Sequence, residues 1–100
     1  MKVLFHIDAY NMWDLLQANV NNILKENPNL EVAVVANAEG VDLFTHPQAL
    51  VEGVKYYVCN NALTARKIDR SRLIDGVEVV SSGVYQILLL QEANFRYIKP

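Results

Sequence analysis

Short apolar runs recur along the whole chain. Residues 3–7, 32–36 and 54–58 are almost entirely apolar or aromatic, and such runs are typical of strands covered on both faces of a parallel sheet. Residues 77–80 and 95–98 give two further runs of the same kind. The pattern therefore predicts five strands, and we expect the first of them to be the central one.

Between the first two runs, the apolar positions change to helical spacing. Asn11 is expected to cap the helix, with Asp14 placed favourably for the helix dipole, and Pro28 to end it. The apolar stripe of this helix consists of Trp13, Leu16, Val20, Ile23 and Leu24. A helix between two buried strands indicates the right-handed crossover unit of a parallel sheet.

The connections in the middle of the chain carry weaker signals. Residues 40–44 are predicted to form one helical turn, and residues 47–52 a short helix with proline at its first position. Residues 60–67 are predicted to form a helix, followed by a turn over residues 68–74. The pattern as a whole predicts a mostly parallel five-stranded sheet in a flavodoxin-like or related three-layer α/β sandwich.

The last predicted helix, over residues 83–92, is apolar nearly all the way round. Ser81 or Ser82 can cap its start, and Asn94 is expected to cap its end. A helix on one side of a sheet needs only one apolar stripe. We therefore expect a second copy of the chain to cover its other side, although the central helix of a tight core would show the same pattern.

Composition narrows the class of protein. The chain has 100 residues, of which 52% are hydrophobic and 20% charged, which predicts a single domain over residues 1–100. A net charge of -2 argues against a nucleic-acid partner, and no apolar run is long enough to span a membrane. The chain has one cysteine and no signal-peptide pattern at its start, so we expect a cytoplasmic protein.

Polar and reactive residues follow the predicted strands, where open α/β sheets place their chemistry. They are His6, Asp8, Asn37, Cys59, Asn60, Asn61, Ser81 and Ser82. If Cys59 begins a helix, the free N–H groups and the dipole there favour the thiolate. A thiolate can attack a sulfane sulfur and hold it as a persulfide. The alternative is that Cys59 is a small buried hydrophobe, as most free cysteines are.

His6 and Asp8 form a second possible pair, because both lie at the end of the first strand. They could hydrogen-bond a ligand or tune the thiolate, or simply satisfy polar atoms at the end of the strand. A zinc site needs three or four ligands, whereas His6, His46 and Cys59 are scattered along the chain. We expect neither a metal nor a cofactor, because the glycine-rich phosphate fingerprint and the serine nucleophile elbow are also missing.

Four basic residues gather after the predicted strand that ends near Cys59. They are Arg66, Lys67, Arg70 and Arg72. The cluster is either a solvated surface or a patch that steers an anionic sulfur donor or an acidic partner.

Three stretches together carry a resemblance to a known family. Val-Lys-Tyr-Tyr-Val-Cys-Asn-Asn-Ala-Leu at residues 54–63, the segment at 75–84 and the end of the chain at 90–100 resemble the DsrE/DsrF-like family. With the strand-helix-strand opening, the resemblance spans nearly the whole chain. It implies a small α/β protein, commonly a trimer or hexamer, that works in an intracellular sulfur relay. The family cysteine that carries a persulfide corresponds to Cys59.

The chain departs from the family pattern in two places. Many members have small residues and glycine after the cysteine, where this chain has Asn60 and Asn61, and the segment between the second and third strands is short. The shortened segment bears on the pocket wall or on the contacts between subunits.

Two hypotheses follow. In the first, the protein is a carrier of the sulfurtransferase type: Cys59 takes sulfane sulfur from a donor protein and passes it to an acceptor protein, in a homotrimer or homohexamer. In the second, the protein is a non-enzymatic oligomeric binding or adaptor module, with a strand-end pocket that Cys59 merely lines. The sequence does not decide whether the protein is an enzyme.

Overall fold

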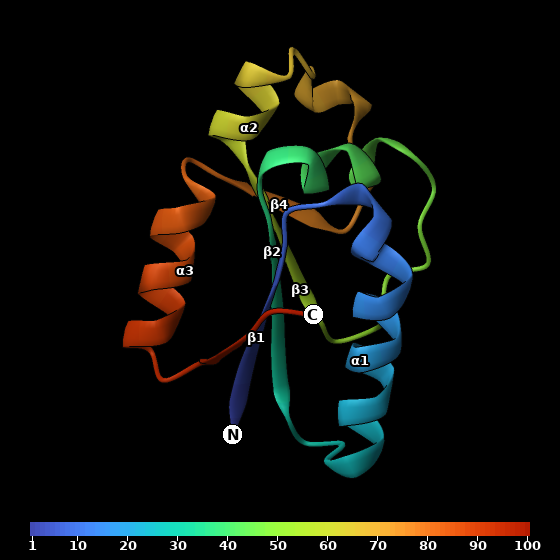
Figure 1. The fold of residues 1–100 in the computed structure, drawn as a ribbon, viewed down its shortest axis with the longest axis vertical. Coiled ribbons are helices and arrows are strands. Elements are labelled where there is room, and N and C mark those ends of the chain that lie inside the picture. The colour runs from blue at the N-terminus through green and yellow to red at the C-terminus, as the bar shows by residue number, and fades with distance from the viewer.

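The computed structural model describes all residues from 1 to 100 and has a five-stranded, all-parallel sheet between helical layers (Figure 1). The strands are β1 (Lys2–Ile7), β2 (Glu31–Ala36), β3 (Lys55–Cys59), β4 (Val77–Val80) and β5 (Arg96–Ile98). The α-helices are α1 (Trp13–Glu26), α2 (Asn60–Ala65) and α3 (Gly83–Glu92). Three 3-10 segments join them, namely η1 (Tyr10–Met12), η2 (Ala38–Thr45) and η3 (Arg70–Arg72). The predicted three-layer α/β fold is confirmed.

The strand order β4-β3-β2-β1-β5 decides which helix covers which face. From β1 to β4 the chain steps in one direction, so right-handed crossovers keep these connections on one face. The step from β4 back to β5 runs the other way and carries α3 over the opposite face, as Figure 1 shows. β5 thus lies at the edge of the sheet beside β1, which is the position that the second strand occupies in flavodoxin. The central strand is β2, so the expectation that the first strand is central was wrong.

Each face of the sheet carries its own core, because side chains alternate along a strand. The larger core joins Phe5, Ile7 and Val34 to Leu16 and Val20 of α1. The smaller core, under α3, consists of Leu4, Ala33, Val35, Tyr57 and Leu90. A single ten-residue helix covers this second face.

The outer side of α3 is apolar and uncovered in the single chain. Val84, Tyr85, Leu88 and Leu89 are between 44% and 67% exposed, whereas Leu90 on the inner side is buried. Although the helix is apolar nearly all the way round, only one of its sides therefore packs on the sheet. No helix of the structure is long and apolar enough to cross a membrane.

The start of α3 is as predicted, and only the residue that caps its end differs from prediction. Ser82, not Ser81, is the cap, since its Oγ accepts a hydrogen bond from the Tyr85 N–H at 3.2 Å. Ala93 is the C-cap, and Asn94 follows it with a left-handed φ of 71°. Asparagine tolerates this conformation better than most residues, which allows the chain to turn toward β5.

The start of α1 corrects another expectation. Asn11 lies inside η1 and caps nothing; the residue before α1 is Met12, which makes no side-chain capping bond. The Met12 N–H donates to the Ala9 carbonyl at 3.2 Å, so the chain already turns before α1 begins. At the other end α1 stops at Glu26, shortly before Pro28.

The short helix predicted over residues 47–52 does not form. Other parts of the molecule bind the backbone of this segment instead: Gln17 Nε2 donates to the Ala49 carbonyl at 2.8 Å, and the Val51 N–H donates to the Tyr56 hydroxyl at 3.0 Å. The Tyr56 hydroxyl in turn donates to Gln17 Oε1 at 3.2 Å. Burial raises the pKa of the Tyr56 hydroxyl, and its hydrogen bonds with Val51 and Gln17 oppose this shift.

The Tyr56 hydroxyl gives a stability test with a control at the next residue. Tyr56→Phe is expected to lower the free energy of unfolding by about 1 to 2 kcal/mol, because the Val51 N–H loses its acceptor. Tyr57→Phe removes a hydroxyl that makes no hydrogen bond, so we expect a change below about 0.5 kcal/mol. Urea unfolding with an unchanged slope measures both, and equal losses would contradict the assignment.

Candidate functional site

All five strands end at the same edge of the sheet, where η2, α2 and η3 gather (Figure 1). Cys59 is the last residue of β3 and the N-cap residue of α2. It lies at a helix start, as the sequence predicts, but its side chain is only 6% exposed and makes no capping hydrogen bond. Its thiol is free, so the sulfur is available for chemistry once a reactant can reach it.

Gly83, the first residue of α3, lies against this cysteine. A Cβ at position 83 would be 3.0 Å from the Cβ of Cys59, 3.1 Å from the Cβ of Asn37 and 3.5 Å from the Cys59 Sγ. The two shorter distances are tighter than ordinary van der Waals contacts. Glycine therefore lets the start of α3 approach the sulfur.

Sequence reasoning did not include Gly83 among the site residues. The signal that could have identified it is the glycine directly after the serine cap. Ser82 already caps α3 and no tight turn is needed there, so neither role accounts for a glycine at this position. With Gly83 in place, the first turns of both α2 and α3 lie near Cys59. The partial positive charge at helix starts favours an anionic group between them.

Asn37 is the second neighbour of Cys59, and a chain of hydrogen bonds holds it. Its Oδ1 lies 2.8 Å from His6 Nε2, and His6 Nδ1 lies 2.6 Å from the Tyr97 hydroxyl. Because an amide oxygen can only accept, Nε2 donates to Asn37, and in a neutral imidazole Nδ1 then accepts from the Tyr97 hydroxyl. His6 thus positions Asn37, and β5 contributes to the site through Tyr97, which sequence reasoning missed.

Asp8 belongs to a different contact. Lys99 Nζ donates to Asp8 Oδ1 at 3.0 Å, and this bond is the main reason why the pKa of Asp8 is below its usual value. Partial burial opposes the shift, while the charges of Lys99 and His6 add to it. No hydrogen bond joins Asp8 to His6 or to Cys59, and each of the two side chains is bonded to other residues near the end of the first strand.

None of the remaining predicted residues forms a hydrogen bond with Cys59. Asn60 Oδ1 accepts from Arg70 at 3.0 and 3.3 Å, and Ser82 is engaged in capping α3. Asn61 and Ser81 are exposed and make no side-chain hydrogen bond. The structure therefore brings together Cys59, Asn37 and, through Asn37, His6.

Cys59 lines none of the five main hollows of the surface. Because Gly83 lies directly against Cys59, which is only 6% exposed, the strand-end pocket expected around the sulfur is not open in this structure. The largest hollow at this edge lies farther along, beside the end of α2.

Comparisons with known proteins agree with this architecture. The model of the DsrE/DsrF-like family matches residues 3–100. The structure of MTH1491 from Methanobacterium thermoautotrophicum, described as a protein of unknown function, is 33% identical, with a TM-score of 0.87 over 99% of this chain and 98% of that one. The YchN protein from E. coli, at 17% identity, shares the fold with a TM-score of 0.69 over 99% of this chain and 97% of its own.

A search among curated proteins returned no significant match. The family match nevertheless spans all five strands and the position of Cys59. The chain belongs to the DsrE/DsrF-like family.

Proposed function

We propose that this protein is a sulfur-relay protein in which Cys59 accepts sulfane sulfur, holds it as a persulfide and passes it on. The observation that carries the proposal is the position of the only cysteine, at the end of β3 and between two helix starts, in a chain of the DsrE/DsrF-like family. Family membership supports a role of the sulfur-relay type, and the persulfide on Cys59 is our more specific inference.

The proposed step conserves electrons. The Cys59 thiolate attacks the outer sulfur of a donor persulfide, so that a bond forms between Sγ and that sulfur. The sulfur–sulfur bond of the donor breaks, and the donor leaves as a thiolate. Delivery is the same exchange in the other direction: the acceptor thiolate takes the outer sulfur, and Cys59 returns to a thiolate.

The neighbouring residues have distinct roles in this proposal. Asn60 and Asn61 contribute backbone N–H groups as the first residues of α2, while the side chain of Asn60 bonds to Arg70 instead. Gly83 lets the start of α3 lie beside the sulfur, and Asn37 lies next to the same glycine. Helix starts stabilise anions, which suits a persulfide anion held at this position.

Sulfur exchange requires access to a side chain that is 6% exposed. The covering group is the start of α3, which a short two-residue connection joins to β4. A small outward movement of this start would uncover Sγ without breaking the sheet. We propose that donor and acceptor proteins approach from the carboxyl edge and that the transfer takes place in the cytoplasm.

We further propose that the chain assembles with copies of itself, as a trimer or hexamer. The support is the outer side of α3, where Val84, Tyr85, Leu88 and Leu89 expose apolar surface along one helix. Such a contiguous patch on a small domain favours burial in an interface. This surface fits the adaptor hypothesis equally well, whereas the position of Cys59 favours the relay.

Sulfur loading tests the relay directly. After incubation with a small-molecule persulfide donor, the intact mass of the native protein is expected to rise by about 32 Da, the mass of one sulfur atom. Cys59→Ser is expected to gain nothing. If the native protein gains no sulfur while the unfolded protein reacts with the same donor, the relay role is contradicted.

Self-association has its own test. Leu88→Glu places a charge in the middle of the apolar side of α3, so we expect it to convert the oligomer to a monomer in light scattering. Asn21→Glu adds the same charge on an exposed position of α1 and is expected to leave the mass unchanged. A wild-type chain that is monomeric at micromolar concentration would contradict the proposal.

A further inference from the structure

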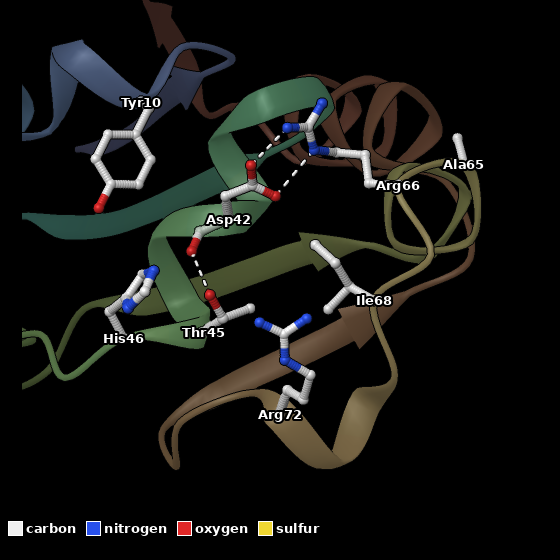
Figure 2. A pocket seen from close by; sticks show the side chains of 8 residues that line it. All are labelled: Tyr10, Asp42, Thr45, His46, Ala65, Arg66, Ile68 and Arg72. Carbon is white, nitrogen blue, oxygen red and sulfur yellow. Dashed lines mark hydrogen bonds and ion pairs between the residues drawn. The ribbon is translucent and has the colours of Figure 1, made fainter.

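A polar hollow of about 610 Å³ lies at the carboxyl edge of the sheet, beyond the end of α2. This volume is in the range of small-molecule sites. Its wall includes Tyr10, Asp42, Thr45, His46, Arg66 and Arg72, which come from η1, η2, the residues after α2, and η3 (Figure 2). Cys59 is not among them; Arg66 follows it by seven residues, or about 10 Å along a helix.

One acid–base pair in the wall is internally satisfied. Arg66 Nε donates to Asp42 Oδ1 at 2.9 Å, and Arg66 Nη2 donates to Asp42 Oδ2, so the two side chains form a bidentate pair, drawn in Figure 2. The charge of Asp42 is therefore largely matched by Arg66. The pair forms part of the wall, and no acidic side chain of the wall is left to pair with the other basic groups of the hollow.

Arg72 is the main uncompensated group. It makes no hydrogen bond and no ion pair, and Figure 2 shows its guanidinium directed toward η2, near Thr45. The pKa of Asp42 is lowered chiefly by the Arg66 hydrogen bond, which outweighs a desolvation effect of opposite sign, and the charges of Arg66, Arg72 and His46 add to the lowering. Arg72 and His46 thus both lie close enough to Asp42 for their charges to act on its carboxylate.

Two further donors face the hollow without a partner. The Tyr10 hydroxyl and the ring nitrogens of His46 make no hydrogen bond, although the Tyr10 backbone N–H donates to Glu39 Oε1 at 2.6 Å and so fixes its segment. Thr45 is different, because its Oγ1 donates to the Asp42 carbonyl at 2.8 Å. The free donors are therefore Arg72, His46 and Tyr10, one from each of three segments.

We propose that this hollow binds a small molecule that carries a phosphate- or sulfate-type oxyanion, with Arg72 as the principal contact and Tyr10 and His46 as further donors. The planar fork of arginine matches the oxygens of such a group. The fork of Arg72 engages both oxygens of a carboxylate, whereas a tetrahedral oxyanion has further oxygens that point toward donors on other segments. This site goes beyond the proposed sulfur relay and does not depend on it, because Cys59 lies outside the hollow.

Titration with inorganic phosphate, followed by amide NMR at constant low ionic strength, tests the site. The Cys59→Ser protein is used so that sulfur chemistry cannot contribute. We expect saturable shifts in η2 and η3, comparable binding of sulfate, and weaker binding of acetate. Shifts that do not saturate, or that appear equally with acetate, would overturn the proposal.

Variants then identify the contacts. Arg72→Gln is expected to weaken phosphate binding about tenfold, whereas Lys67→Gln, which removes the same charge from a nearby exposed position outside the hollow, is expected to change it less than about twofold. Tyr10→Phe removes only the hydroxyl and should weaken binding in the same direction as Arg72→Gln.

Asp42→Asn offers a gain of function. Because it removes the only acid of the hollow's wall and releases Arg66, we expect tighter phosphate binding than in the wild type. Binding that is no tighter, or an equal loss in the Lys67 and Arg72 variants, would show general charge attraction and contradict a built site. Unchanged amide dispersion confirms that each variant is folded.

Discussion

The contact between Gly83 and Cys59 is the constraint on which the arrangement of the site depends. α3 crosses the face of the sheet opposite to α1, and its first residue lies on the cysteine at the end of β3. With any side chain at position 83, the Cβ would meet Cys59 and Asn37 at about 3 Å. The single hydrogen of glycine therefore decides how closely a helix start approaches the only thiol.

The crossing of α3 follows from the strand order. Because β5 pairs with β1 and not with β4, the last connection runs back across the sheet, and right-handedness places it on the uncovered face. The same return brings Tyr97 beside His6, whose other ring nitrogen bonds to Asn37, the residue that lies next to Gly83. The return of the chain from β4 to β5 thus brings two groups to the site: Gly83 at the start of α3, and Tyr97, which acts through His6.

The carboxyl edge holds two chemically different places. At Cys59 the surroundings are close-packed, and the charge comes from helix starts. Beyond α2 the surroundings are open, and the charge comes from the guanidinium of Arg72. The ion pair of Arg66 with Asp42 lies between α2 and η2 and forms the near wall of the polar hollow. Both places use the connections after the strands, where a parallel sheet concentrates its chemistry.

The sequence was sufficient for elements whose pattern is local. The strand Val77–Val80 and the helix Gly83–Glu92 lie where apolar spacing and the serine cap predict them. Features set by distant contacts were not accessible: residues 47–52 stay irregular because Gln17 and Tyr56 bind their backbone, and the place of β1 depends on where β5 returns. Cys59 at a helix start was predictable from the residues around it, but its burial was not, because the covering glycine arrives from the last crossover.

The central claim is that Cys59, though covered, becomes reachable through a local movement of the start of α3. Thiol labelling of the native protein at increasing low concentrations of urea, beside hydrogen exchange of the sheet amides, measures the free energy of the opening that exposes the sulfur. We expect this free energy to lie well below that of global unfolding and to be nearly independent of urea. A value equal to that of global unfolding, with the same dependence on urea, would contradict the claim.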